Sequence, residues 1–303
     1  MASFRSRFVA LCLLLFGAFV PDVISQSLSK LEDPPWVKDV ASKRIVYSVP
    51  GMERVEVRRD LVYKRAADFA LKADVYSPPR HKRGTPQPAV IFIHGGSLPP
   101  NLLTKPKDWG VYRSYGQLIA ASGFVGITFN HRYHGYDFLD EAQSDVDDLI
   151  AYVRNRADAL GVDKERIFIW AFSAGGIFLS HALRAAPPYI RGIIAYYALL
   201  DLRPRRKEVP ASVSDEALQE FSPLYHVSSS GKMLPPMFVA RAGRDDADLN
   251  RALDRFVQEA TAKSANLDFS NHATGRHGFD IFNDDARSRE IIKRTVDFIK
   301  LKD

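Results

Sequence analysis

The clearest chemical signal in this 303-residue chain is a serine that stands between a predicted strand and a predicted helix. Ser173 follows the apolar run 167–172 and is followed at 174–176 by Ala-Gly-Gly. A nucleophile elbow has this form, because its sharp strand-to-helix turn lifts the hydroxyl above the sheet and tolerates only small neighbours. Ala171 stands where that motif usually has glycine. By itself, the pattern fits a nucleophile and a helix start that merely allows close packing equally well.

A second motif, His-Gly-Gly-Ser at 94–97, follows a continuous apolar run. When a serine attacks a carbonyl carbon, two backbone N–H groups aimed at the oxygen stabilise the charge that develops there. We expect one donor at Ala174, directly after the serine, and the other at Gly96. Gly95 and Ser97 are alternative donors and expected substrate contacts. The simpler interpretation is a glycine turn whose histidine braces the loop.

A late histidine is the predicted general base. His277 lies in Gly-Arg-His-Gly-Phe-Asp at 275–280, after the last predicted strand. Late loops of a doubly wound sheet return to its active edge. An imidazole placed there can take the serine proton and pass it to the leaving group. His272, nearby in the sequence, fits better as a surface histidine.

The acid that orients the imidazole is expected after the predicted strand 237–242. The segment Gly-Arg-Asp-Asp-Ala-Asp at 243–248 offers three carboxylates. Asp245 is the expected partner of the histidine, and Asp246 is the close alternative. Asp248 is expected to begin the next helix, because acids are favoured at helix N-termini. The chain order serine, acid, histidine agrees with that of enzymes that carry a nucleophile elbow.

The segments between these residues alternate strand and helix. Continuous apolar runs indicate strands covered on both faces, and helical patterns between them indicate crossovers. Alternating patterns at 55–57 and 69–76 indicate antiparallel strands at the start. The later strands are expected at 89–93, 124–130, 166–172, 190–197, 237–242 and 267–270. The helices are expected at 112–122, 141–160, 174–186, 249–263 and 286–301. The fold class is therefore α/β, with helices on both faces of a mostly parallel sheet.

One segment interrupts this alternation. Residues 200–235 are polar and rich in proline, with one helical stretch near 215–221. Long insertions between strands are usually functional, and we interpret this one as a small lid over the carboxyl edge of the sheet. The folded domain is expected to span 45–303, after a polar lead-in at 26–44 that is poorly ordered or draped.

These motifs together resemble the α/β-hydrolases of the esterase/lipase type, close to feruloyl and acetylxylan esterases and to prolyl-oligopeptidase-like hydrolases. The resemblance covers about residues 55–302. It is carried by the motif 94–97, the elbow at Ser173, the acid after Gly243 and the segment 275–279. It implies an α/β-hydrolase fold with a sheet of about eight strands and an antiparallel start. It also implies hydrolysis of carboxylic esters through an acyl-enzyme on the serine.

Composition and charge exclude several classes of protein. Hydrophobic residues make up 46% and charged residues 26%, as in soluble globular proteins. The net charge of +6 is spread along the chain, whereas nucleic-acid binders gather it on one face, so no nucleic-acid partner is expected. The single cysteine, Cys12, excludes a disulfide framework. No dinucleotide fingerprint occurs, and His131 and His134 lack the paired spacing of catalytic zinc ligands, so we expect no cofactor and no metal.

The first 25 residues have the layout of a secretory signal peptide. Two arginines precede the apolar run 8–20, and small or aliphatic residues lead to a cleavage site near Ser25. The run is shorter than the ~20 residues of a transmembrane helix. The protein is therefore expected to be secreted or periplasmic, without stable membrane insertion after cleavage. An uncleaved anchor is the alternative.

The sequence thus predicts an exported serine hydrolase of carboxylic esters. Short acyl chains are favoured, because the lid segment lacks a long apolar helix to shelter a fatty chain. The expected partner is a small-molecule or polysaccharide-linked ester. Trp109 either lines the acyl or alcohol pocket or packs in the core. An exported serine peptidase and a catalytically silent binding protein are the alternatives, and the oligomeric state stays open.

Overall fold

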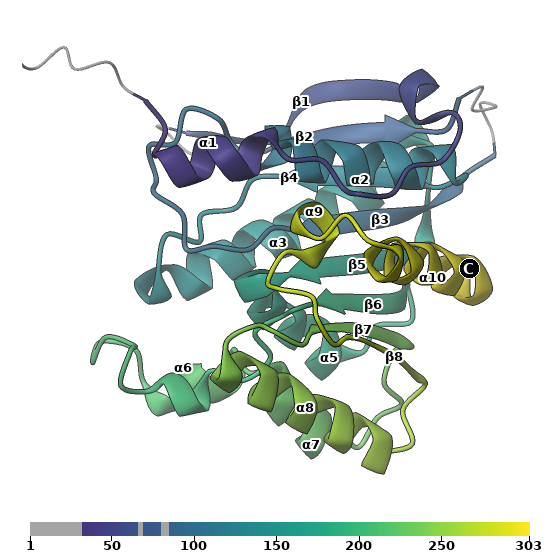
Figure 1. The fold of residues 1–303 in the computed structure, drawn as a ribbon. Helices are drawn as coiled ribbons and strands as arrows, with labels where there is room; N and C mark the ends of the chain where they lie inside the picture. The colour runs from purple at the N-terminus through teal and green to yellow at the C-terminus, as the bar shows by residue number, and fades with distance from the viewer. Residues whose placement is uncertain (1–31, 66–68, 80–84) are drawn as a thin grey trace, which may run out of the picture. The chain divides into compact units, whose positions relative to one another are not determined.

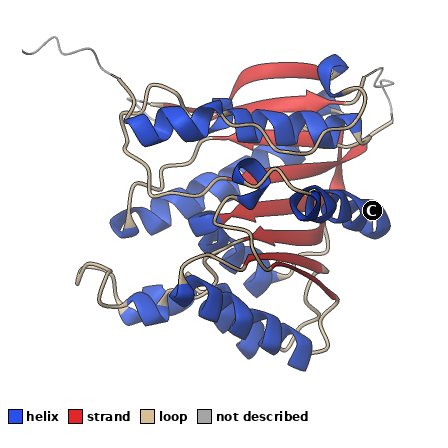
Figure 2. Cartoon of the chain, in the orientation of Figure 1, coloured by secondary structure: helices blue, strands red, loops and turns tan. Residues whose placement is uncertain are grey.

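The computed structural model describes residues 32–65, 69–79 and 85–303 (Figures 1 and 2). Within it, Asp33–Asp303 form one compact unit. The expected signal peptide 1–25, with Cys12 and the cleavage site at Ser25, lies outside the described residues.

Eight strands of the described chain form one sheet, in the order β1-β2-β4-β3-β5-β6-β7-β8. They are β1 (Glu56–Arg65), β2 (Ala70–Ser77), β3 (Gln87–Ile93), β4 (Val125–Phe129), β5 (Val162–Phe172), β6 (Ile190–Tyr196), β7 (Met237–Ala242) and β8 (Leu267–His272). The pairs β1–β2 and β2–β4 are antiparallel, and every other pair is parallel. The predicted mostly parallel sheet with an antiparallel start is confirmed.

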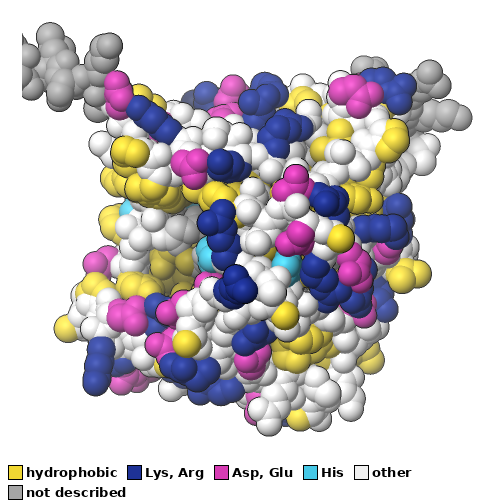
Figure 3. Space-filling view, in the orientation of Figure 1, with side chains coloured by type: hydrophobic (Ala, Val, Ile, Leu, Met, Phe, Trp, Pro, Cys, Tyr) yellow, Lys and Arg dark blue, Asp and Glu magenta, His cyan; other side chains and the backbone are white. Residues whose placement is uncertain are grey.

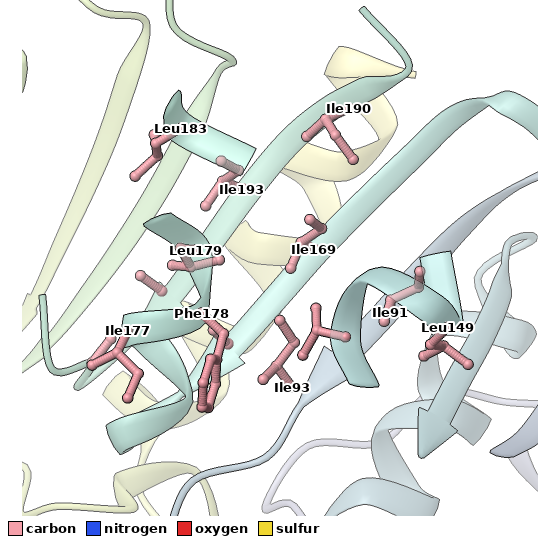
Figure 4. Close-up of a cluster of buried hydrophobic side chains, with 14 of the residues drawn as sticks. Ile91, Ile93, Leu149, Ile169, Ile177, Phe178, Leu179, Leu183, Ile190 and Ile193 are labelled. Atoms are coloured by element: carbon pink, nitrogen blue, oxygen red, sulfur yellow. The ribbon is translucent and has the colours of Figure 1, made fainter. Parts of the chain in front are cut away.

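Side chains of the central strands alternate between two hydrophobic cores, one on each face of the sheet. Along β3, Ile91 and Ile93 belong to one core, whereas Val90 and Phe92 belong to the other. Figure 4 shows part of the first core, where Ile169 of β5 lies among side chains from several elements. Because both faces are buried, these strands read in the sequence as continuous apolar runs.

Helices cover both faces, as predicted. The first core includes side chains of α3 (Leu139–Asn155), α5 (Ser180–Ala185) and α8 (Ala247–Ala262). The second core includes side chains of α2 (Gly110–Ala121) and α10 (Ala286–Lys302). The remaining α-helices are α1 (Pro35–Ser42), α4 (Ala157–Leu160), α6 (Asp215–Glu220), α7 (Pro223–Ser229) and α9 (Phe279–Phe282).

The described part of the lead-in, residues 32–44, agrees with the draped alternative and not with the poorly ordered one. Residues Pro35–Ser42 form α1, in which Pro35 occupies the first turn, where its missing N–H is tolerated. Val37 is fully buried in the second core, and the helix lies against α2. Gly110, at the start of α2, permits this approach, because a Cβ there would lie 2.4 Å from the carbonyl oxygen of Lys43.

The interrupting segment 200–235 contains only short helical elements. It comprises the 3-10 turn η6 (Arg203–Arg205), α6 and α7, and α6 lies within the predicted helical stretch. α7 packs against α5 and α8, and Leu224 and Val227 on α7 join the first core. The segment is therefore anchored to the domain at α7. In Figure 1, α6 lies on the side of the view toward which β5 and β6 point.

The visible surface mixes the two signs of charge. In Figure 3, lysine and arginine side chains are interspersed with aspartate and glutamate on the face shown. Among the described helices, none is both long enough and apolar enough to cross a membrane.

Candidate active site

Ser173 occupies a strained turn at the end of β5. Its backbone φ of +52° lies in the left-handed region, which residues other than glycine rarely adopt. The chain then enters the 3-10 helix η5 (Ser173–Leu179), followed by α5, where the sequence predicted one helix over 174–186. Backbone strain of this kind persists only where surrounding structure holds it. Here the N–H of Leu199 donates to the carbonyl oxygen of Ser173 at 2.9 Å.

The small residues around the serine are required by close backbone contacts. A Cβ on Gly175 would lie 2.6 Å from the carbonyl oxygen of His94. A Cβ on Gly176 would lie 2.7 Å from the Cβ of Ala198. Ala171, in contrast, is fully buried in the first core, and its methyl is accommodated there. The departure from glycine at this position therefore leaves the turn intact.

Three side chains far apart in the sequence meet beside this turn. His277 Nε2 lies 2.9 Å from Ser173 Oγ, and His277 Nδ1 lies 2.6 Å from Asp245 Oδ2. The Asp245 side chain is only 6% exposed, whereas that of His277 is 43% exposed. The carboxylate is thus shielded from water, whereas the imidazole is partly exposed to solvent. This chain of contacts has the geometry of a Ser-His-Asp triad.

The loops that carry the histidine and the acid are joined to each other. The backbone N–H of Arg244 donates to the carbonyl oxygen of Gly275 at 2.8 Å. The N–H of Gly243 donates to the carbonyl oxygen of His272 at the same distance. Because β7 and β8 are neighbouring parallel strands, the loops that follow them emerge side by side. The pairing of these strands therefore places His277 against Asp245.

Asp245 and Asp246 have different roles although they are adjacent. Asp245 contacts the imidazole. Asp246 is the N-cap of α8, where its Oδ1 accepts from the N–H groups of Asp248 and Leu249 at 3.0 and 2.9 Å. Of the two carboxylates that the sequence left open, only Asp245 faces the base.

The loop 94–97 lies against the serine. A Cβ on Gly95 would be 2.7 Å from the Cβ of Ser173, so glycine is needed for this approach. The N–H of Gly95 donates to the hydroxyl of Tyr112 at 3.3 Å, which engages one of the alternative oxyanion donors. Gly96 has a φ of +118°, another position that favours glycine. Ser97 is exposed.

Ala174 is the first residue after Ser173. It occupies the first turn of η5, where backbone N–H groups have no acceptor within the helix. Its N–H is therefore available to an oxyanion beside Ser173.

Trp109 lies in the core and not in an open pocket. It is 4% exposed, belongs to the second core, and donates its indole N–H to the carbonyl oxygen of Thr104 at 2.9 Å. Of the two interpretations that the sequence allowed, the structure supports core packing. His272, expected at the surface, is also buried, and its Nε2 contacts Asp285 and Ser288.

The first residue of the loop 94–97, His94, stacks on a second buried histidine, His131. The rings of His94 and His131 lie 3.6 Å apart and are nearly parallel. Burial lowers the pKa of His94 to about 4 and lowers the pKa of His131 well below its ordinary value. Both rings are therefore neutral at pH 7. The sequence predicted the bracing role of the first histidine but did not identify its partner.

Acid is expected to destabilise the protein through this pair. The unfolded chain binds a proton at His94 below about pH 6.5, whereas the folded chain does so only near pH 4. Stability present above pH 6.5 is therefore lost as the pH falls toward 4, by about 3 kcal/mol for His94. Urea unfolding at pH 7 and pH 4.5 measures this loss. His94→Asn should make the loss of stability between these two pH values smaller, because one of the two buried histidines no longer titrates; an unchanged loss would contradict the assignment.

A cavity of about 580 Å³ is lined in part by the loop that follows the motif 94–97. Its walls include Phe69, Leu71, Leu98, Lys107 and His134. Neither Ser173 nor His277 lines it. Within the described ranges, no cluster of three or more His, Cys, Asp or Glu side chains is arranged to hold a metal.

Comparisons with known proteins agree with this architecture. The family model BD-FAE matches residues 73–183. A probable isoprenylcysteine alpha-carbonyl methylesterase of Oryza sativa subsp. japonica is 27% identical over 159 residues, covering 49% of this chain and 36% of that protein. Bile salt-activated lipase of Bos taurus is 29% identical over 117 residues, covering 35% of this chain and 19% of that protein. The chain thus spans about a third or less of the length of these curated relatives.

Solved structures show the same fold. The butyrate-bound structure of esterase Est2 from Thermogutta terrifontis has a TM-score of 0.64 at 21% identity, covering 82% of this chain and 95% of that one. The propionate-bound structure of the same esterase has a TM-score of 0.62 at 20% identity, covering 83% and 94%. The sheet order and these structures together show that the chain has the fold of an α/β-hydrolase, and its sequence is similar to those of an esterase and a lipase.

Proposed function

We propose that this protein is a serine hydrolase of carboxylic esters that works through an acyl-enzyme on Ser173. The observation that carries the proposal is the continuous contact from Ser173 Oγ through His277 to Asp245, at 2.9 and 2.6 Å. The relatives support the same class of reaction, since those reported above are named as esterases or as a lipase.

The reaction proceeds in two halves. His277 takes the proton of Ser173 as the serine oxygen bonds to the ester carbonyl carbon, and Asp245 stabilises the imidazolium that forms. The N–H groups of Gly96 and Ala174 stabilise the oxyanion. His277 then donates the proton to the departing alkoxide, which leaves as the alcohol. Water then attacks the acyl carbon and loses a proton to His277. The bond from that carbon to Ser173 Oγ breaks, His277 returns the proton to this oxygen, and the acid is released.

Short acyl chains are the proposed substrates. The segment 200–235, which we propose acts as a lid, has only the short helices α6 and α7 beyond β6, of six and seven residues. Without a long apolar helix over the site, extra methylene groups of a fatty chain find little surface to be buried against and add little binding energy. The structural neighbour Est2 was solved with butyrate and with propionate, which are short acyl groups.

A series of p-nitrophenyl esters tests this proposal. We expect kcat/KM to be highest for acetate or butyrate and at least about tenfold lower for palmitate. The matching acetyl p-nitroanilide should be cleaved far more slowly than the ester, whereas a peptidase would cleave the amide readily. Methyl ferulate and acetylated xylan extend the series to the polysaccharide-linked esters. A protein that cleaves none of these esters would contradict the proposal.

We also propose that the enzyme is exported. The support is the signal-peptide layout of residues 1–25, with two arginines before an apolar run and small or aliphatic residues near Ser25. N-terminal sequencing of the protein recovered outside the cytoplasm should begin near Gln26. Recovery only inside the cytoplasm, with residues 1–25 intact, would overturn export.

A further inference from the structure

A buried carboxyl group lies close to the base and has no part in the reaction described above. Asp280 is fully buried at the start of α9, three residues after His277. Its Oδ1 accepts a hydrogen bond from the hydroxyl of Tyr197 at 2.7 Å, and its Oδ2 accepts one from the hydroxyl of Tyr115 at 2.8 Å. Because both oxygens accept, the ionised form is the one that satisfies both hydroxyl groups.

Tyr197 links this carboxyl group to the imidazole. Its ring centroid lies 4.7 Å from that of His277. The backbone of Tyr197 has a φ of +36°, a left-handed conformation that is unfavourable for an aromatic residue. Its N–H donates to the carbonyl oxygen of Ala240 at 2.8 Å, which holds it beside the sheet. Strain of this kind is typical of residues that position reacting groups.

We propose that Asp280 is a positioning residue for the base: its carboxylate fixes Tyr197 beside the His277 ring and stabilises the positive charge that this ring acquires. The proposal rests on the proposed function. It assigns the chain two acids with different tasks. Asp245 hydrogen-bonds the imidazole directly, whereas Asp280 acts through Tyr197 and through space.

The groups around Asp280 agree with this task. Burial raises the pKa of its carboxyl, while the hydroxyl groups of Tyr197 and Tyr115 and the positive charge of His277 act in the opposite direction. Interactions between two charges are mutual, so a carboxylate that is stabilised by the imidazolium also stabilises that imidazolium. Tyr112 on α2 and Tyr196 on β6 are further titratable groups near enough for the charge of Asp280 to act on them. Within the described ranges, no lysine or arginine contacts the carboxyl group.

Asp280→Asn tests the proposal, because it keeps the size and one acceptor oxygen but removes the charge. We expect kcat for p-nitrophenyl acetate to fall about tenfold with KM nearly unchanged, and the acid limb of the kcat/KM profile to move to lower pH by about one unit. Tyr197→Phe, which breaks the link but adds no new polar group, should lower kcat in the same way. Asp285→Asn removes a carboxylate that contacts His272 instead, and it should leave the profile unchanged.

The outcomes separate this proposal from the proposed function. If the wild-type enzyme cleaves the ester and Asp280→Asn shows the wild-type kcat and pH profile, the positioning role is overturned while the esterase assignment stands. A folded variant with lower kcat and an unmoved acid limb also overturns it, since that pattern indicates a merely structural contact. If Asp280→Asn does not fold, the kcat of Tyr197→Phe decides: a value equal to wild type refutes the role. A wild-type protein without esterase activity refutes the proposed function itself.

Discussion

Ser173→Ala is expected to abolish hydrolysis of p-nitrophenyl acetate while leaving the fold intact. The variant lacks the oxygen that would form the acyl bond, so kcat should fall by about 10⁴-fold or more. Alanine keeps the Cβ that is already accommodated beside Gly95, and it adopts the left-handed turn at a similar energetic cost. Circular dichroism and the thermal midpoint should therefore match those of the wild-type protein. Initial rates with the purified variant measure the loss.

A fluorophosphonate probe provides the control for this variant. The wild-type protein should be labelled at Ser173, and Ser173→Ala should not be labelled. Ser144→Ala, on the exposed side of α3, should keep both the labelling and the activity. A wild-type protein that resists the probe would indicate the catalytically silent binding protein. A Ser173→Ala variant with full activity would mean that another group is the nucleophile.

Asp245→Asn is expected to lower kcat by about 10⁴-fold, as when the acid of a Ser-His-Asp triad becomes an amide. The amide nitrogen can donate to His277 Nδ1, which now lies 2.6 Å from Asp245 Oδ2. That bond favours the tautomer whose proton is on Nε2. A ring in this tautomer cannot accept the proton of Ser173, because the accepting nitrogen is already protonated.

Asp246→Asn is the matched control, since it makes the same chemical change one residue along the chain. Asparagine caps a helix as well as aspartate does, so α8 should keep its N-cap. The free energy of unfolding should therefore be close to that of the wild-type protein. We expect kcat within about twofold of the wild type. Steady-state kinetics of both variants decide between the two acids. An inactive Asp246→Asn beside an active Asp245→Asn would reverse the assignment.

Much of the site could be predicted from the sequence, because its parts have local signatures. The turn at Ser173 requires small residues after it, and the approach of Gly95 to the serine requires a residue without a Cβ. Both requirements appear as glycine-rich motifs directly after apolar runs. The central strands could also be predicted from the sequence. Burial on both faces makes each of them a continuous apolar run without polar positions. Strand ends were less certain: β5 begins at Val162, within a polar stretch that sequence patterns assign to a loop.

Other features depend on distant contacts and have no local signature. The sequence predicted a poorly ordered or draped lead-in at 26–44. Residues 35–42 of it form a helix, because Val37 is buried against α2. Trp109 was equally suited to a pocket or to the core, and only the packing around it decided for the core. Asp280 is only three residues after His277 in the sequence, but its partners Tyr115 and Tyr197 are 165 and 83 residues away from it.

The sequence by itself determined the fold class, and it singled out Ser173, His277 and a short stretch of candidate acids for the predicted site. Only the tertiary structure decided which of two neighbouring carboxylates turns toward the imidazole. Asp245 and Asp246 have the same chemistry and nearly the same sequence surroundings. They differ because the turn after β7 directs the first side chain toward the loop that follows β8 and the second toward the N-terminus of α8. That direction is set by the pairing of β7 with β8, which no local pattern encodes.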